Sequence, residues 1–226
     1  MNDHPHHFDE TEREAVYRAI RERRDMRHFQ RGGRVPEVVL QRLLAAAHQA
    51  PSVGLMQPWR IIRIRNPALR EAIHALVNEE RRRTAEALGV RGEEFLRLKV
   101  EGIREAAELL AVVLAPDDGT VFGRRTLPRE MALCSAACAI QNLWLASRAE
   151  NLGMGWVSLF DPQALAERLH LPEGALAIAL LCLGPVEGFY PRPMLELEGW
   201  RQARPLTEMV FEDRWPETQG SGDGPG

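Results

Sequence analysis

The stretch Pro128–Phe160, "PREMALCSAACAIQNLWLASRAENLGMGWVSLF", predicts a long helix followed by a strand. Its first part is apolar or small nearly all round over several turns, which is typical of a helix buried on most sides. Gly153 ends that helix, and "GMGWVSLF" follows as the strand. Cys134 and Cys138 lie one turn apart on the helix. Because no further ligand accompanies them, we interpret them as small buried thiols rather than a metal or redox pair.

The rest of the chain carries similar signals on both sides of this stretch. Apolar runs predict three more strands, at 58–65, 109–116 and 175–184. Apolar residues at helical spacing predict five more helices, which begin at Asp9, Pro36 and Asp161 or span 67–88 and 93–107. Asp9 and Glu12 have the spacing of a capping box, and Ile62 and Ile64 would face the interior. Helices that interrupt strict strand–helix alternation predict an α+β fold.

Size and composition indicate one globular domain. The chain has 226 residues, of which 45% are hydrophobic and 27% charged. We expect residues 9–216 to fold as one domain, with an arm at about 188–216 and disordered ends at 1–8 and 217–226. The net charge of −3 argues against binding to nucleic acid or an anionic membrane surface. Three cysteines, no signal peptide and no apolar run near the ~20 residues of a membrane span indicate a cytoplasmic protein.

A cluster of arginines surrounds one acid in "RERRDMRHF", which spans Arg21–Phe29. The chain has no P-loop, no GxGxxG, no HExxH and no zinc-spaced CxxC, so side chains would have to hold any bound phosphate. Arginine forks suit that task, although a solvated charged face has the same composition. Asp25 either forms an ion pair with Arg21 or Arg27, or has a chemical role beside a bound anion.

A second candidate segment is "QAPSVGLMQPW", which spans Gln49–Trp59. Ser52 and Gln57 can each donate and accept hydrogen bonds, as the edge of a heteroaromatic ring would require. An ordinary connection between a helix and a strand would also be rich in Pro and Gly, so this composition alone leaves both interpretations open.

Five segments in order resemble the nitroreductase-like flavoproteins. They are "RRDMRHF", "APSVGLMQPWR", "RLKVEGIR", "CAIQNLWLASRAENLGMGWVSLF" and "LELEGWRQ", and the resemblance runs from Glu14 to Trp215. It is closer to the 5,6-dimethylbenzimidazole synthase branch of that family. The resemblance implies an α/β sandwich with a central mixed or antiparallel sheet and surrounding helices. It also implies an intertwined homodimer that binds flavin mononucleotide (FMN) at its interface, to which the helix 129–151 contributes.

The resemblance also implies which residues contact the flavin. Arginines of the first motif would bind its phosphate and polar edge, and three residues of the predicted strand would line its ring. The implied contacts are Arg23, Arg24, Asp25, Met26, Arg27, Ser52, Leu98, Trp156, Val157, Ser158 and Arg201, with no metal ligand. Asp25 and Ser158 would be catalytic: the first moves protons, and the second forms a hydrogen bond near the reactive nitrogen.

Two departures from ordinary nitroreductases favour the synthase branch. Asp25 stands where those enzymes usually carry a hydroxyl residue, and Leu55 stands where they carry an amide. The branch implies that reduced FMN is a substrate, which O2 fragments to 5,6-dimethylbenzimidazole, the lower ligand of vitamin B12, and a sugar phosphate. A separate flavin reductase would supply the reduced flavin. The alternative is an NAD(P)H-dependent FMN nitroreductase or quinone reductase with the same fold.

The charged segment 78–104 is interrupted by Gly89 and Gly92. One interpretation is a solvated helical hairpin. The other is a lid that keeps water away from the reduced flavin and oxygen.

Overall fold

The computed structural model describes residues 6–119 and 129–215. The chain divides into two compact units, Met1–Pro191 and Arg192–Gly226. The second unit corresponds in position to the predicted arm and contains the short helix α7 (Met194–Leu197) and a 3-10 turn, Leu206–Glu208. The predicted disorder at the first five residues and at 217–226 lies outside the described residues.

The first unit is built on a four-stranded sheet with the order β1-β2-β4-β3. Its strands are β1 (Trp59–Arg63), β2 (Glu108–Leu114), β3 (Gly153–Val157) and β4 (Leu176–Gly184). All three neighbouring pairs are antiparallel, with a register shift in β2 between Val112 and Val113. The four predicted strands and the α+β class are therefore confirmed, and the sheet is antiparallel rather than mixed.

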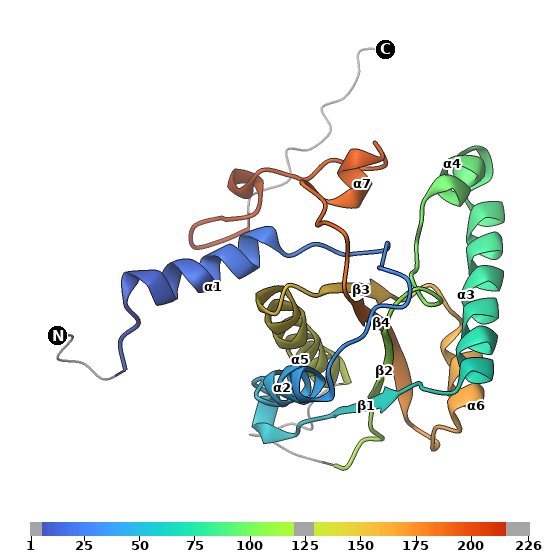
Figure 1. The fold of residues 1–226 in the computed structure, drawn as a ribbon, viewed down its shortest axis with the longest axis horizontal. Helices are drawn as coiled ribbons and strands as arrows, with labels where there is room; N and C mark the ends of the chain where they lie inside the picture. Colours follow the sequence, from blue (N-terminus) through green and yellow to red (C-terminus); the bar gives the residue numbers. More distant parts are fainter. Residues whose placement is uncertain (1–5, 120–128, 216–226) are drawn as a thin grey trace. The chain divides into compact units, whose positions relative to one another are not determined.

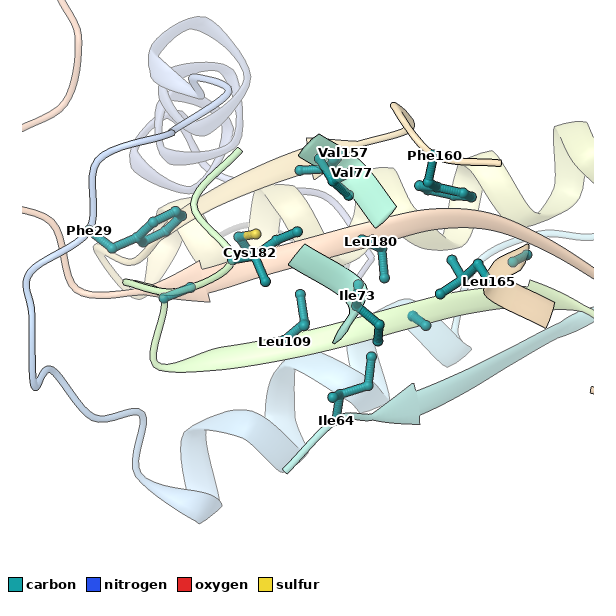
Figure 2. Close-up of a cluster of buried hydrophobic side chains, with 14 of the residues drawn as sticks. Phe29, Ile64, Ile73, Val77, Leu109, Val157, Phe160, Leu165, Leu180 and Cys182 are labelled. Carbon is teal, nitrogen blue, oxygen red and sulfur yellow. The ribbon is translucent and has the colours of Figure 1, made fainter. Parts of the chain in front are cut away.

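Helices cover both faces of this sheet (Figure 1). The helices of the first unit are α1 (Glu10–Glu22), α2 (Glu37–His48), α3 (Pro67–Ala87), α4 (Gly92–Arg97), α5 (Arg129–Ala149) and α6 (Pro162–Leu169). Side chains of α2 and α5 pack with Leu110, Val112 and Leu181 on one face. Side chains of α3 and α6 pack with Leu109 and Leu180 on the other face, where Figure 2 shows the cluster. A strand covered on both faces needs a nearly continuous apolar sequence, which β2 and β4 have.

Local signals at the helix starts are confirmed. Asp9 and Glu12 form the predicted capping box at the start of α1. The side chain of Asp161 accepts hydrogen bonds from the N–H groups of Gln163 and Ala164 at the start of α6. These side chains satisfy N–H groups that the first turn of a helix leaves without partners.

The predicted helix 93–107 is wrong over most of its length, because α4 ends at Arg97. The chain then runs without helix or strand to β2. Gly102 packs so closely on the earlier segment that an added Cβ would lie 2.5 Å from the Phe29 ring and 3.0 Å from the Arg27 carbonyl oxygen. This contact between distant segments replaces the helical turns that local sequence favours.

The interpretation of Cys134 and Cys138 as buried thiols is also wrong for this chain, since both are exposed on α5. The third cysteine, Cys182, is fully buried, and burial raises the pKa of its thiol to about 12. On α1, Val16 and Ile20 are 50% and 48% exposed. Apolar or weakly polar faces of α5 and α1 are therefore uncovered in a single chain.

A short segment extends the sheet beyond β3. Asp25 forms a parallel bridge with Met154, and the Met26 N–H donates to the Met154 carbonyl oxygen at 2.9 Å. Gly155 allows this approach, because an added Cβ would lie 2.1 Å from the Met26 carbonyl oxygen. The glycine in "GMGWV" thus permits main-chain contact between two segments that are far apart in sequence.

We predict that Gly155→Ala destabilises the protein by about 1–3 kcal/mol, because the Met26 main chain must move away from the new methyl group. Urea denaturation measures the change. Gly188→Ala is the matched control, since no heavy atom lies within 4 Å of its Cβ position. Equal midpoints for the two variants would contradict the proposed close approach.

Candidate functional site

Asp25 is held by hydrogen bonds to both of its carboxylate oxygens. Oδ1 accepts a hydrogen bond from the Trp156 main-chain N–H at 2.9 Å. Oδ2 accepts one from Arg27 Nη2 at 2.6 Å. The Asp25 side chain remains 42% exposed. Of the two ion-pair partners considered for Asp25, Arg27 is the one in contact, whereas Arg21 pairs with Glu14; the chemical role of Asp25 stays a prediction. The carboxylate is thus fixed in direction while part of it stays accessible.

The surroundings of Asp25 also change its acidity. Burial raises the pKa of the Asp25 carboxyl above its usual value. The charge of Arg27, the Trp156 N–H and the charge of Arg23 act in the opposite direction. A raised pKa brings an aspartate closer to the range in which it can both accept and donate a proton near neutral pH.

Arg27 points inward, and the residue is only 8% exposed. Besides the bond to Asp25, its Nη2 donates to the Trp156 carbonyl oxygen at 2.8 Å. Its Nε and Nη1 are buried and have no hydrogen-bond partner among the described residues. Buried donors without a partner are costly, so these two N–H groups fit a ligand or water with acceptor atoms.

The two preceding arginines lie at the end of α1. The Arg23 guanidinium stacks over the Trp144 ring at 4.4 Å from its centroid, and burial lowers its pKa below the usual value. Arg24 donates to the carbonyl oxygens of Arg21, Arg23 and Pro191, which leaves its buried Nε without a partner among the described residues. The guanidinium groups therefore form a local positive region beside Asp25.

Trp144 fixes the main chain of this region, a role that the sequence analysis did not assign. Its indole Nε1 donates to the carbonyl oxygens of Arg24 and Met154, at 3.2 and 3.1 Å. The indole thereby joins α5, β3 and residues 23–30, which we call the arginine segment. Sequence gave no signal for this, because a tryptophan on an apolar helix is more often only a core residue.

Ser52 lies in a different place from Asp25. The Ser52 hydroxyl accepts a hydrogen bond from the Gln57 N–H at 3.1 Å. The N–H of Val53, the residue after Ser52, donates to the hydroxyl of Ser135 on α5. Gly54, Leu55 and Gln57 have positive φ angles of 58°, 54° and 42°, a costly backbone for the two side-chain-bearing residues.

The two parts of the predicted flavin site lie at opposite ends of β2. The segment that contains Ser52 leads into Trp59, which pairs with Leu114 at the end of β2. Asp25 pairs with Met154, whose partner on β4 is Leu183, and Leu183 in turn pairs with Glu108 at the start of β2. A seven-residue strand spans roughly 20 Å, so one chain does not bring the two parts together.

The other predicted contacts differ in how accessible they are. Met26, Leu98 and Val157 are 0%, 4% and 1% exposed. In the single chain their side chains are therefore too buried to contact a flavin. Trp156 is half-buried and its ring lies 6.4 Å from that of Trp144. Ser158 follows β3 rather than lying within a buried strand, and it is exposed. Its predicted role stays a prediction.

Arg201 belongs to the second compact unit, so its phosphate contact also stays a prediction. A cavity of about 360 Å³ is lined by Met56, Leu114 and Arg129 and lies at the end of the sheet away from Asp25. Across residues 6–119 and 129–215, no three His, Cys, Asp or Glu side chains are grouped as a metal site. No described helix is both long and apolar enough to span a bilayer.

The model of the nitroreductase family matches residues 20–185. The chain belongs to the nitroreductase family. A relative in Rhodobacter capsulatus, named 5,6-dimethylbenzimidazole synthase, is 41% identical over 201 residues, which cover 88% of this chain and 96% of that protein. A protein of the same name in Rhodospirillum rubrum is 41% identical over 204 residues, which cover 88% of this chain and 94% of the relative.

Solved structures of family proteins and related flavoproteins share the fold of this chain. A BluB-like flavoprotein from Clostridium difficile matches with a TM-score of 0.67 at 17% identity, covering 87% of this chain and 97% of that one. Iodotyrosine deiodinase bound to FMN and 3-iodo-L-tyrosine matches with a TM-score of 0.63 at 23% identity, covering 78% and 94%. At these identities the structures support the fold alone.

We predict that Arg27→Met raises the pKa of Asp25 further, because the nearby positive charge is the largest effect that lowers it. Carbon-detected NMR titration of the carboxyl group measures the shift. Arg24→Met is the control, since the Arg24 guanidinium bonds to main-chain carbonyl groups. A pKa that is unchanged in Arg27→Met, or equally raised in both variants, would contradict this assignment.

Proposed function

We propose that this nitroreductase-family protein is a 5,6-dimethylbenzimidazole synthase, which converts reduced FMN and O2 to 5,6-dimethylbenzimidazole and a sugar phosphate. The observation that carries the proposal is the Asp25 carboxylate, fixed by Trp156 and Arg27 beside a cluster of arginines yet partly exposed. The 41% sequence identity between this chain and two relatives named 5,6-dimethylbenzimidazole synthase, each covering 88% of the chain, supports the same conclusion.

The residues around Asp25 fit an anionic flavin. FMN carries a phosphate and several ring oxygens and nitrogens, and these match the guanidinium groups at the end of α1. Arg24 and Arg27 each retain at least one N–H without a partner among the described residues. Such donors suit phosphate or carbonyl oxygens, and because they are buried in the single chain, the bound flavin would have to displace the side chains that cover them. Reduced FMN supplies the electrons that O2 accepts, and a separate flavin reductase is the proposed source of this reduced flavin.

Asp25 would act as the proton-transfer group. Its carboxylate already accepts two hydrogen bonds, which fix the direction of its remaining lone pairs. Burial raises its pKa, so the Asp25 carboxylate is a stronger base than an ordinary aspartate. Ser158, exposed just beyond β3, would donate or accept one hydrogen bond at the ring.

A homodimer would complete the site. In one chain Ser52 and Asp25 lie at opposite ends of β2, so we infer that a second copy supplies Ser52. The uncovered faces of α1 and α5 are suitable contact surfaces, because they expose Val16, Ile20 and Cys138. Burial of such faces is the usual driving force for association.

We predict that Asp25→Asn retains FMN binding but lowers benzimidazole formation by about 10²–10⁴-fold, the usual contribution of general acid–base catalysis. The assay supplies reduced FMN and air and identifies the product by mass spectrometry. The wild-type protein should consume flavin and form benzimidazole, whereas a nitroreductase would return intact FMN. Normal benzimidazole yield from the variant would contradict the role of Asp25, and intact FMN from wild type would contradict the proposed function.

The hairpin of α3 and α4 is the proposed lid over the flavin. Gly92 packs against α3 so closely that a Cβ would lie 2.3 Å from the Ala85 carbonyl oxygen. Arg81 on α3 donates to the carbonyl oxygens of Leu96 and Leu98 at the end of α4. These contacts hold the hairpin closed on itself, which a lid that excludes water requires.

We predict that Gly92→Ala loosens the hairpin and increases the hydrogen peroxide released per flavin consumed, because water reaches the site. A peroxidase-coupled assay measures the ratio. The control is Val90→Ala, since Val90 is fully exposed and its truncation leaves the hairpin contacts intact. If Gly92→Ala gives the wild-type peroxide yield, the segment is a solvated hairpin rather than a lid.

A further inference from the structure

The segment that follows β4 runs alongside the arginine segment. We call residues 185–191 the strap. Hydrogen bonds join the two segments at three levels: the Gln30 N–H to the Pro185 carbonyl oxygen at 2.9 Å, the Arg27 N–H to the Tyr190 hydroxyl at 3.2 Å, and Arg24 Nη2 to the Pro191 carbonyl oxygen at 3.1 Å. Residue numbers fall along one segment as they rise along the other, so the strap runs antiparallel to Arg24–Gln30.

The arginine segment is therefore held from two sides. On one side Met26 and Asp25 bond to β3. On the other, the Arg27 N–H has a side-chain hydroxyl as its partner, where a neighbouring strand would have offered a carbonyl oxygen. Arg27 is only 8% exposed, and a main-chain N–H that is shielded from water and unpaired costs about as much as a lost hydrogen bond. Tyr190 thus fixes the main chain two residues beyond Asp25.

The Tyr190 hydroxyl makes a second short contact, 2.6 Å to Nδ1 of His28. The hydroxyl already accepts the Arg27 N–H, so its own proton can be donated to Nδ1. This direction requires Nδ1 to be unprotonated and places the proton of the neutral imidazole on Nε2. The two rings meet edge to face, with centroids 6.0 Å apart. Tyr190 is therefore oriented by His28 on one side and by Arg27 on the other.

We propose that Tyr190, oriented by His28, is a positioning residue for Asp25. This inference rests on the proposed function, in which Asp25 is the proton-transfer group. Tyr190 fixes the Arg27 main chain, Arg27 in turn bonds to the Asp25 carboxylate, and the accessible part of that carboxylate keeps its direction. Tyr190 itself would contact neither the flavin nor the reacting atoms.

The test is Tyr190→Phe, which keeps the ring and removes the hydroxyl. We expect FMN affinity and KM to change by less than about twofold and kcat for benzimidazole formation to fall about tenfold, the equivalent of a loss of roughly one hydrogen bond. The control is Tyr17→Phe, the same substitution at a tyrosine 62% exposed on α1. A KM increase with kcat unchanged would overturn the proposal, because it would make Tyr190 a binding residue.

Combining Tyr190→Phe with Asp25→Asn tests whether Tyr190 acts through Asp25. If it does, the double variant is no slower than Asp25→Asn alone, since the group being positioned is already absent. Losses that multiply in the double variant would overturn the proposal. His28→Asn keeps an acceptor for the tyrosine proton and should therefore be more active than His28→Leu. Equal activities of the two variants would show that His28 does not orient Tyr190.

Two measurements on the flavin-free protein keep this inference separate from the proposed function. With ¹⁵N-labelled histidine, the Nδ1 shift of His28 should show an unprotonated acceptor, and it should change in Tyr190→Phe. Hydrogen exchange at the Arg27 amide should become faster in the same variant. An unchanged shift and exchange rate would overturn the inference even if wild type makes benzimidazole. Absence of benzimidazole from wild type, with both NMR changes present, would overturn the proposed function and the catalytic part of the inference.

Discussion

The structure of the site depends on one main-chain contact, the parallel pairing of Asp25–Met26 with the edge strand β3. Gly155 makes the contact possible, because any side chain there would collide with the Met26 carbonyl oxygen. Once the segment lies against β3, the Trp156 N–H reaches Asp25 and the Trp156 carbonyl oxygen reaches Arg27. The same strand therefore orients both the carboxylate and the guanidinium of the Asp25–Arg27 pair.

The electrostatic arrangement follows from this geometry. A buried arginine needs a counterion, and a partly buried aspartate beside it costs less than an isolated charge of either sign. Arg27 retains N–H groups without a partner among the described residues, and Asp25 retains accessible surface. The pair is thus incomplete in a way that suits a bound anionic ligand with both donor and acceptor atoms.

Much of the fold was predictable from sequence, because it depends on local signals. The apolar runs at β2 and β4 and the capping box at Asp9 act within a few residues. The errors arise where distant segments decide the outcome. α4 ends at Arg97, and the non-helical segment that follows packs on Phe29 through Gly102. The exposure of Cys134 and Cys138 likewise depends on what covers α5. The motif around Asp25 was visible, but its bond to the Trp156 N–H, 131 residues away, has no local signal.

The most direct test of the account is an experimental structure of the protein with bound FMN. We predict a dimer in which the arginines at the end of α1 contact the phosphate or polar edge. We also predict that the Asp25 carboxylate lies about 2.6–3.2 Å from the ribityl side of the flavin, or one water molecule away. An interface without a cleft for the tricyclic ring would contradict the account. So would an Asp25 carboxylate that faces solvent, remote from the flavin.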